Sequence, residues 1–109
     1  MEIYEAVKAM SSLAHETRLG IFRLLVQAGE AGLSVGQINE AMRLAAPTLS
    51  FHLKELNGAG MAISRQEGRH IYYRANYESM DKLLAYLTDN CCQGEACLSV
   101  KSCSTGEKP

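Results

Sequence analysis

Two short helical patterns near the middle of this 109-residue chain constrain its fold most. Apolar residues recur at helical spacing in residues 38–42 and again in residues 49–56. Ser34 precedes the first pattern and is followed three residues later by Gln37, which predicts a capping box at a helix start. Pro47 precedes the second pattern and suits a first helical turn. The sequence therefore predicts two helices joined by a tight turn.

A β-hairpin is expected directly after the second of these helices. Gly58 and Gly60 end the helix, and the runs MAISRQ and HIYYRA that follow predict two strands joined at Gly68. Further helices are predicted at residues 3–13, at 16–28 and from Tyr77 onward. This order predicts a mainly α fold with a β-hairpin wing, a winged helix-turn-helix, in which the helix after Pro47 enters the DNA major groove.

The charges are unevenly distributed along the chain. The net charge is −1, yet the stretch from Arg43 to Arg74 holds five Lys or Arg against two Glu, a surplus of three. His52 and His70 lie in the same stretch. Segregation of this kind favours a face that attracts phosphates on a mildly acidic body, with ordinary surface charge as the alternative.

The outward face of the helix after Pro47 supplies candidate DNA contacts. With Leu49, Leu53 and Leu56 inward, hydroxyl groups and Lys54 face outward, where they can bind phosphates or base edges. Phe51 suits a thymine methyl group, unless a neighbouring loop covers it. The histidine next to it is either a structural residue at the core edge or a DNA contact. On this helix the candidates are Pro47, Thr48, Ser50, Phe51, His52 and Lys54.

The hairpin supplies the remaining candidates for DNA binding. Arg65, Arg69 and His70 are placed to reach phosphates or the minor groove, with a solvated hairpin edge as the alternative. Tyr72 and Tyr73 alternate in a strand, so one is expected in the core and the other facing DNA.

All four cysteines lie in the last fifth of the chain, at Cys91, Cys92, Cys97 and Cys103. Thiolates select soft ions. A disulfide between adjacent cysteines is strained, so Cys91 and Cys92 are both expected as thiolates, with Cys97 as a third ligand. Three thiolates suit trivalent arsenic or antimony, whereas four would suit zinc. We therefore expect a DNA-binding and dimerisation domain at 1–90 and an inducer-binding tail at 91–109.

Three segments together carry a family resemblance. The runs SSLAHETRLGIFRLL, PTLSFHLKELNGAGM and SRQEGRHIYYR resemble the ArsR/SmtB family of metal-sensing repressors, and the likeness covers residues 5 to about 88. The resemblance implies a homodimer through the first and last helices, which binds operator DNA, an inverted repeat, and releases it when an inducer binds.

The chain departs from that family at its known inducer sites. Ser34-Val35-Gly36 stands where many members carry two cysteines, and no histidine lies between Tyr77 and Asp89 for a zinc site. Ala45 replaces the usual Ser or Thr cap of the recognition helix. By elimination Cys91, Cys92 and Cys97 are the candidate site for arsenite, As(III), or antimonite, Sb(III). Zinc or cadmium sensing and a thiol redox switch stay open as alternatives.

The position of the cysteines suggests how they act. Tyr77, Met80, Leu84, Leu87 and Cys91 share one helical spacing, so the cluster is expected to cap the last helix. A thiol enzyme is not expected. Such enzymes usually place the reactive thiolate at a helix start, whereas these cysteines follow a helix end, whose dipole disfavours a thiolate. A protein-binding adaptor is a further alternative. No signal peptide or membrane-spanning run is apparent, so a cytoplasmic location is expected.

Overall fold

The structure is a computed structural model of the chain, and it describes residues 1–94. The predictions that concern Cys97 and Cys103 therefore lie outside the described residues. The described elements are α1 (Ile3–Leu13), α2 (Glu16–Ala28), β1 (Leu33–Ser34), α3 (Val35–Met42), α4 (Ala46–Gly58), β2 (Ala62–Glu67), β3 (His70–Ala75), α5 (Tyr77–Leu87) and a short 3-10 turn at Cys91–Gly94.

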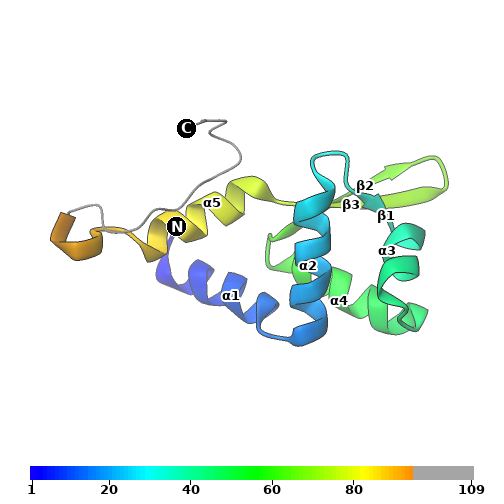
Figure 1. The fold of residues 1–109 in the computed structure, drawn as a ribbon, viewed down its shortest axis with the longest axis horizontal. Helices are drawn as coiled ribbons and strands as arrows, with labels where there is room; N and C mark the ends of the chain where they lie inside the picture. The colour runs from blue at the N-terminus through cyan, green and yellow to red at the C-terminus, as the bar shows by residue number, and fades with distance from the viewer. Residues whose placement is uncertain (95–109) are drawn as a thin grey trace.

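The elements form a winged helix-turn-helix with an extension at one end (Figure 1). The β2–β3 hairpin and α3 lie at one end, α1 and α5 lie at the other, α2 stands between them, and α4 runs alongside the hairpin. The strands make an antiparallel sheet in the order β1-β3-β2, and β2 packs against α4. The predicted fold class is confirmed.

Local signals in the sequence set the helix starts. Ser34 Oγ accepts a hydrogen bond from the Gln37 backbone N–H at 3.1 Å, and Gln37 Oε1 accepts one from the Ser34 N–H at 2.9 Å. The predicted capping box at the start of α3 is thus confirmed. Ala45 caps α4 without any side-chain hydrogen bond, as its methyl side chain requires, and Pro47 lies in the first turn.

The core lies where α2, α3 and α4 meet the sheet. The predicted inward stripe of α4 is confirmed, because Leu49, Leu53 and Leu56 are all fully buried. The other large side chains that are fully buried are Ile21 and Leu25 of α2, Ile38 of α3, and Met61. Truncating one such side chain to alanine typically costs about 2–5 kcal/mol, so these leucines hold α4 in one rotational setting.

Strand β1 is the element that the sequence did not predict. Leu33 pairs with Tyr73 and Ser34 with Tyr72. Just before it, Gly32 has φ +73°, and a Cβ built there would lie 2.3 Å from the carbonyl oxygen of Tyr73. Only glycine fits this close approach. A strand of two residues is too short for any periodicity to predict.

Helix α5 is joined to the rest of the domain by two side chains. Asn76 caps α5 by accepting from the Ser79 N–H at 3.2 Å, and its Nδ2 donates to the Gly60 carbonyl at 2.8 Å. The Tyr77 hydroxyl donates to the Val26 carbonyl at 2.7 Å, at the end of α2. These bonds connect α5 to both α2 and the α4–β2 turn.

The prediction that Cys91 continues the stripe of the last helix is wrong. Helix α5 ends at Leu87, and Thr88 caps it with its Oγ1 donating to the Leu84 carbonyl at 2.9 Å. Asn90 then takes a left-handed conformation, φ 59°, which turns the chain away from the helix axis. Cys91 therefore begins a separate turn.

Replacing Tyr77 by phenylalanine should destabilise the domain by about 0.5–1.5 kcal/mol, because the α2 carbonyl loses its donor. Tyr86→Phe is the matched control, since the hydroxyl of this core-packed tyrosine makes no hydrogen bond within residues 1–94. Urea unfolding of both variants measures the difference. Equal losses in the two variants would show that the Tyr77 bond contributes nothing.

Candidate nucleic-acid interface and cysteine turn

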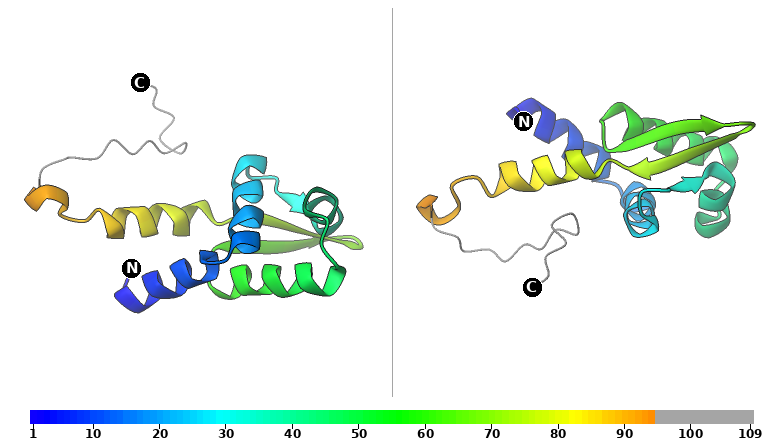
Figure 2. Two further views of the ribbon diagram at one scale, coloured as in Figure 1. Left: turned by 60° about the horizontal axis from the view of Figure 1, so that its bottom comes forward. Right: turned by 90° about the horizontal axis from the view of Figure 1, so that it is seen from above.

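One face of α4 points away from the core and forms a continuous polar surface. We call it the reading face; the predicted DNA contacts exposed on it are the five residues Pro47, Thr48, Ser50, Phe51 and Lys54, and Glu55 is exposed beside them. Figure 2 shows α4 along one side of the molecule, next to the hairpin. The structure therefore brings together these five predicted residues. Its hydroxyl groups and ammonium group are of the kind that bind phosphates and base edges.

His52 lies behind the reading face, not on it. Its side chain is 5% exposed, and its Nδ1 accepts a hydrogen bond from Arg18 Nε at 3.3 Å. The His15 ring lies 4.8 Å away, centroid to centroid. Of the two interpretations of His52, the structure supports the structural residue, and it corrects the placement of His52 among surface contacts.

Sequence reasoning missed Arg18. A signal was present, because Arg18 precedes the buried Ile21, Phe22 and Leu25 by three, four and seven residues, and so shares their face of α2. A charged residue on a buried face needs a partner. His52 is that partner, but only the tertiary structure shows which residue faces Arg18.

The protonation state of His52 follows from this setting. Burial, then the charge of Arg18, then that of His15 lower the pKa of His52, and the Glu55 carboxylate opposes them weakly. The imidazole is therefore neutral at pH 7, which leaves Nδ1 able to accept the bond from Arg18.

The basic side chains of the wing differ in how much they interact with the rest of the protein. Arg65 forms an ion pair with Glu67 at 2.8 Å, and its guanidinium lies 4.7 Å from the centroid of the Tyr72 ring. Arg69 and His70 are exposed at the hairpin turn. Tyr73 packs against the core, which confirms that one of the two tyrosines lies there, whereas Tyr72 is half-buried beneath Arg65. Within residues 1–94, the Arg69 side chain makes no ion pair and no hydrogen bond, so its charge is available to a ligand.

The cysteine turn follows α5. The sulfur atoms of Cys91 and Cys92 lie 3.6 Å apart, at a half-buried and an exposed residue respectively. Cys91 is a free thiol. The expectation that Cys92 also binds as a thiolate stays a prediction. Within residues 1–94, no group of three or more His, Cys, Asp or Glu is placed to hold a metal ion. The predicted third ligand, Cys97, lies beyond this range.

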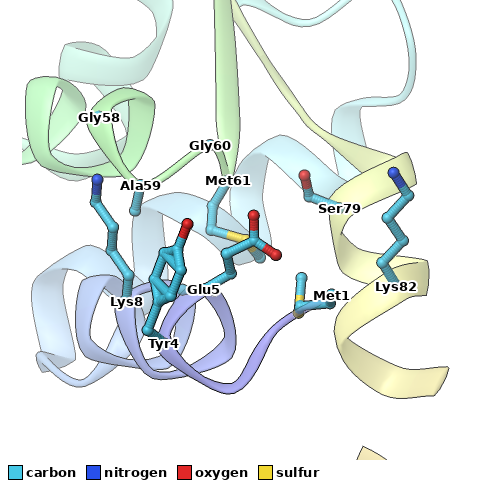
Figure 3. Close-up of a pocket in the computed structure, with 11 residues that line it drawn as sticks. Met1, Tyr4, Glu5, Lys8, Gly58, Ala59, Gly60, Met61, Ser79 and Lys82 are labelled. Atoms are coloured by element: carbon cyan, nitrogen blue, oxygen red, sulfur yellow. The ribbon is translucent and has the colours of Figure 1, made fainter. Parts of the chain in front are cut away.

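A hollow of about 540 Å³ separates α1 from α5, and the α4–β2 turn closes one side of it (Figure 3). Lys8 and Lys82 stand on opposite walls, with the Glu5 carboxylate between them. Apolar side chains are exposed close by on α1, where Ile3 and Tyr4 are each 68% exposed, and at the end of α5, where Leu87 is 53% exposed. The end of the molecule formed by α1 and α5 thus leaves much apolar surface uncovered.

Known proteins share this arrangement. A family model for a helix-turn-helix domain matches residues 13–65. The biofilm growth-associated repressor of Agrobacterium fabrum is 34% identical over 83 residues, which are 76% of this chain and 68% of that protein. The arsenical resistance operon repressor of Escherichia coli is 37% identical over 68 residues, 62% of this chain and 56% of that protein.

A solved structure extends the likeness to three dimensions. The homodimeric winged helix-turn-helix DNA-binding domain from Mycobacterium bovis, described as that of a possible ArsR-family regulator, superposes with a TM-score of 0.64 at 27% identity, covering 89% of this chain and 90% of that domain. The chain belongs to the ArsR family. It spans only about half the length of the arsenic-resistance regulators that it matches.

In this ArsR-family chain the matched region contains both helices of the helix-turn-helix and the start of the wing. It also contains Arg18, His15 and His52, so the network behind the reading face lies inside the part of the domain that the family model describes. The cysteine turn lies outside that region. Within residues 1–94, none of the helices has the length and apolarity needed to cross a membrane.

The stability of this ArsR-family domain should fall as the pH drops below about 6.5, the usual pKa of histidine. The folded pKa of His52 is lowered, so below about 6.5 the unfolded chain binds a proton that the folded chain excludes. The contribution of neutral His52 to the stability of the fold is fully present above about pH 6.5. It is lost progressively as the pH falls from there to the lowered pKa of His52 in the folded protein. His52→Asn retains an acceptor for Arg18 but does not titrate.

Urea unfolding of both proteins at about pH 7.5 and about pH 5.5 measures the effect, in a window around the histidine pKa. The wild type should lose more stability than His52→Asn over this range. A parallel decline in the two proteins would assign the pH dependence to His15, His70 or the carboxylates instead.

Proposed function

We propose that the chain is a cytoplasmic transcriptional repressor, which binds an inverted-repeat operator as a homodimer and is released by trivalent arsenic or antimony. The inducer would bind thiolates of Cys91, Cys92 and Cys97. The observation that carries the DNA-binding part is the reading face of α4, which exposes hydroxyl groups, Lys54 and one aromatic ring beside the wing, on a helix whose leucine stripe is fully buried.

The proposal for DNA follows from shape and charge. An α-helix fits the major groove, and α4 offers hydroxyl groups, an ammonium group and one aromatic ring on its open side. Arg69 and His70 extend from the hairpin turn, where a wing can reach the backbone or the minor groove. The surplus of positive charge in residues 43–74 supports attraction to phosphates despite a net charge of −1.

The proposal for a homodimer rests on the apolar surface of α1 and α5. Exposed apolar groups in one patch mark a surface that another protein covers. The relative from Mycobacterium bovis is a homodimer. A two-fold pairing through α1 and α5 would cover Ile3, Tyr4 and Leu87 and would close the hollow between the helices. It would also set the spacing of two reading faces, which a two-fold symmetric operator requires.

The proposal for the inducer rests on sulfur geometry and on relatives. Two sulfurs bound to one ion at about 2.3 Å each lie no more than about 4.6 Å apart. The 3.6 Å between the sulfurs of Cys91 and Cys92 fits within that span. Three of the related proteins are named arsenic-resistance regulators. Binding needs both cysteines in their reduced form, because the thiolate is the metal ligand.

The cysteine turn would act through α5. It lies at the far end of the molecule from the hairpin (Figure 2), and α5 reaches back to Asn76 and Tyr77. A shift of α5 at a dimer interface would change the spacing of the two reading faces. Coupling of this kind is reciprocal and typically amounts to about 1–3 kcal/mol, so operator DNA should weaken inducer binding by the same factor.

The alternatives predict different chemistry at the same cysteines. The ArsR family comprises DNA-binding regulators, which weighs against a thiol enzyme. Zinc or cadmium sensing would require a fourth sulfur, Cys103. A redox switch would respond to oxidants without any ion. An adaptor would bind no DNA.

The reduced protein should bind its operator with an affinity that falls steeply as the salt concentration rises. Arg69→Ala should weaken binding to all duplexes and lower the log–log salt slope by about 0.9 for each phosphate that the arginine no longer neutralises. Ser50→Ala should weaken operator binding more than random binding. Arg23→Ala, at an exposed arginine of α2, is the control for charge and should leave the slope unchanged. Fluorescence anisotropy titrations give these values, and equal affinity for operator and random duplex would refute the repressor hypothesis.

Serine at Cys91, Cys92 or Cys97 should leave operator binding intact and abolish release by arsenite, because each substitution removes one of three thiolates. Cys103→Ser is the matched control and should respond like the wild type. The measurement is operator release under strictly reducing conditions, with arsenic K-edge absorption reporting the number of sulfur ligands.

Two outcomes would change this assignment. If Cys103→Ser also loses the response and zinc shows four sulfur ligands, the site is a tetrahedral zinc site. If peroxide releases the operator reversibly while arsenite does not, the cysteines form a redox switch.

A further inference from the structure

Arg18 connects three helices directly behind the reading face. From α2, its Nε donates to His52 Nδ1 of α4 at 3.3 Å, and its Nη1 donates to the Ser12 carbonyl at the end of α1 at 3.5 Å. The centre of its guanidinium lies 5.7 Å from the centroid of the Phe51 ring. A planar group with donors on two sides can hold two acceptors in fixed positions.

Phe51 is the large apolar side chain on the reading face, and it is 54% exposed. One side of its ring is supported, since the His52 ring lies 5.5 Å away at an angle of 59°, and that ring packs on His15 in turn. The rest of the ring faces outward among polar neighbours. An exposed ring on a surface built for DNA gains most by covering an apolar group there.

Base edges in the major groove present one such group. Hydrogen-bond donors and acceptors mark adenine, guanine and cytosine, whereas thymine also presents its 5-methyl group. We infer that Phe51 contacts the 5-methyl group of an operator thymine, and that Arg18 is the positioning residue that holds the Phe51 ring through its bonds to His52 and Ser12. The inference rests on the proposed DNA binding and names the chemical group that the helix recognises.

The chemistry of the network supports this role for Arg18. His52 must be neutral to accept from Arg18, and burial together with the charges of Arg18 and His15 keeps its pKa low, with Glu55 opposing. Lysine at position 18 would keep the charge but has a single ammonium group, which cannot reproduce the two fixed directions. The geometry of the network, and not its charge alone, is therefore what positions the ring.

Thymine-to-uracil substitution tests the contact, because it removes only the methyl group. An operator is first selected from randomised duplexes with the reduced full-length protein. Each symmetry-related pair of thymines is then replaced by deoxyuridine. At one pair, wild-type affinity should fall about fourfold for each half-site, the effect of losing one buried methyl group. Phe51→Ala should bind both operators equally, and Phe51→Leu should keep part of the discrimination.

The role of Arg18 is tested with the same two operators. Arg18→Met, which keeps the apolar stem, should lose most of the thymine discrimination, because the ring loses its fixed support. Arg18→Lys should lose it as well, although the charge is retained. Arg23→Met is the control, an exposed arginine of the same helix. Thermal unfolding verifies that each variant is folded. If Arg18→Met does not fold, Arg18→Lys alone tests the positioning role.

The possible failures are distinguishable. Equal wild-type affinity for all uracil-containing operators, or unchanged discrimination in Phe51→Ala, would overturn the thymine contact. Normal discrimination in Arg18→Lys would overturn the positioning role. If the wild type selects no operator at all, the proposed function fails, and this inference fails with it.

Discussion

Burial of the α4 leucines against α2 is the constraint on which the rest of the structure depends. Leu49, Leu53 and Leu56 are at most 1% exposed, and Ile21 and Leu25 of α2 are fully buried with them. Because these three positions are buried in the core, only the opposite face of α4 is exposed to solvent. The side chains at 47, 48, 50, 51 and 54 are exposed for that reason. The presentation of polar groups to DNA is thus a consequence of packing.

The same constraint explains which features were predictable. The positions of the helices, the capping box at Ser34 and the inward stripe of α4 depend on residues close in sequence, so local pattern predicts them. Strand β1 depends on pairing with the distant residues Tyr72 and Tyr73, and no pattern in the neighbouring sequence predicts it. The bond from Arg18 to His52 spans 34 residues, and only the packing of α2 on α4 brings the two side chains together.

The misplacement of Cys91 has a related cause. The spacing from Tyr77 through Leu87 continues to Cys91, so periodicity extends the helix by a further turn. Helix length depends on its end, however, and Thr88 and the left-handed Asn90 stop it. Asparagine adopts this conformation more readily than most residues, so its position was a usable signal for the end of the helix. The cysteine turn is therefore a separate element that follows α5 and does not extend it.

The start of α3 illustrates why a sensing site can move within one fold. Ser34 accepts from the Gln37 N–H, and Gln37 returns a bond to the Ser34 N–H, so this segment satisfies two backbone donors that the helix start leaves unpaired. Many members of the resembled family carry two cysteines at this place. Cysteines here would replace a strong cap with weak hydrogen-bonding groups. Thiols placed after α5 leave that cap, the α4 leucines and the Arg18 network undisturbed. If α5 sets the spacing of two reading faces, a ligand at its end acts on the same geometry as one at α3, and the DNA-contacting half of the domain need not change.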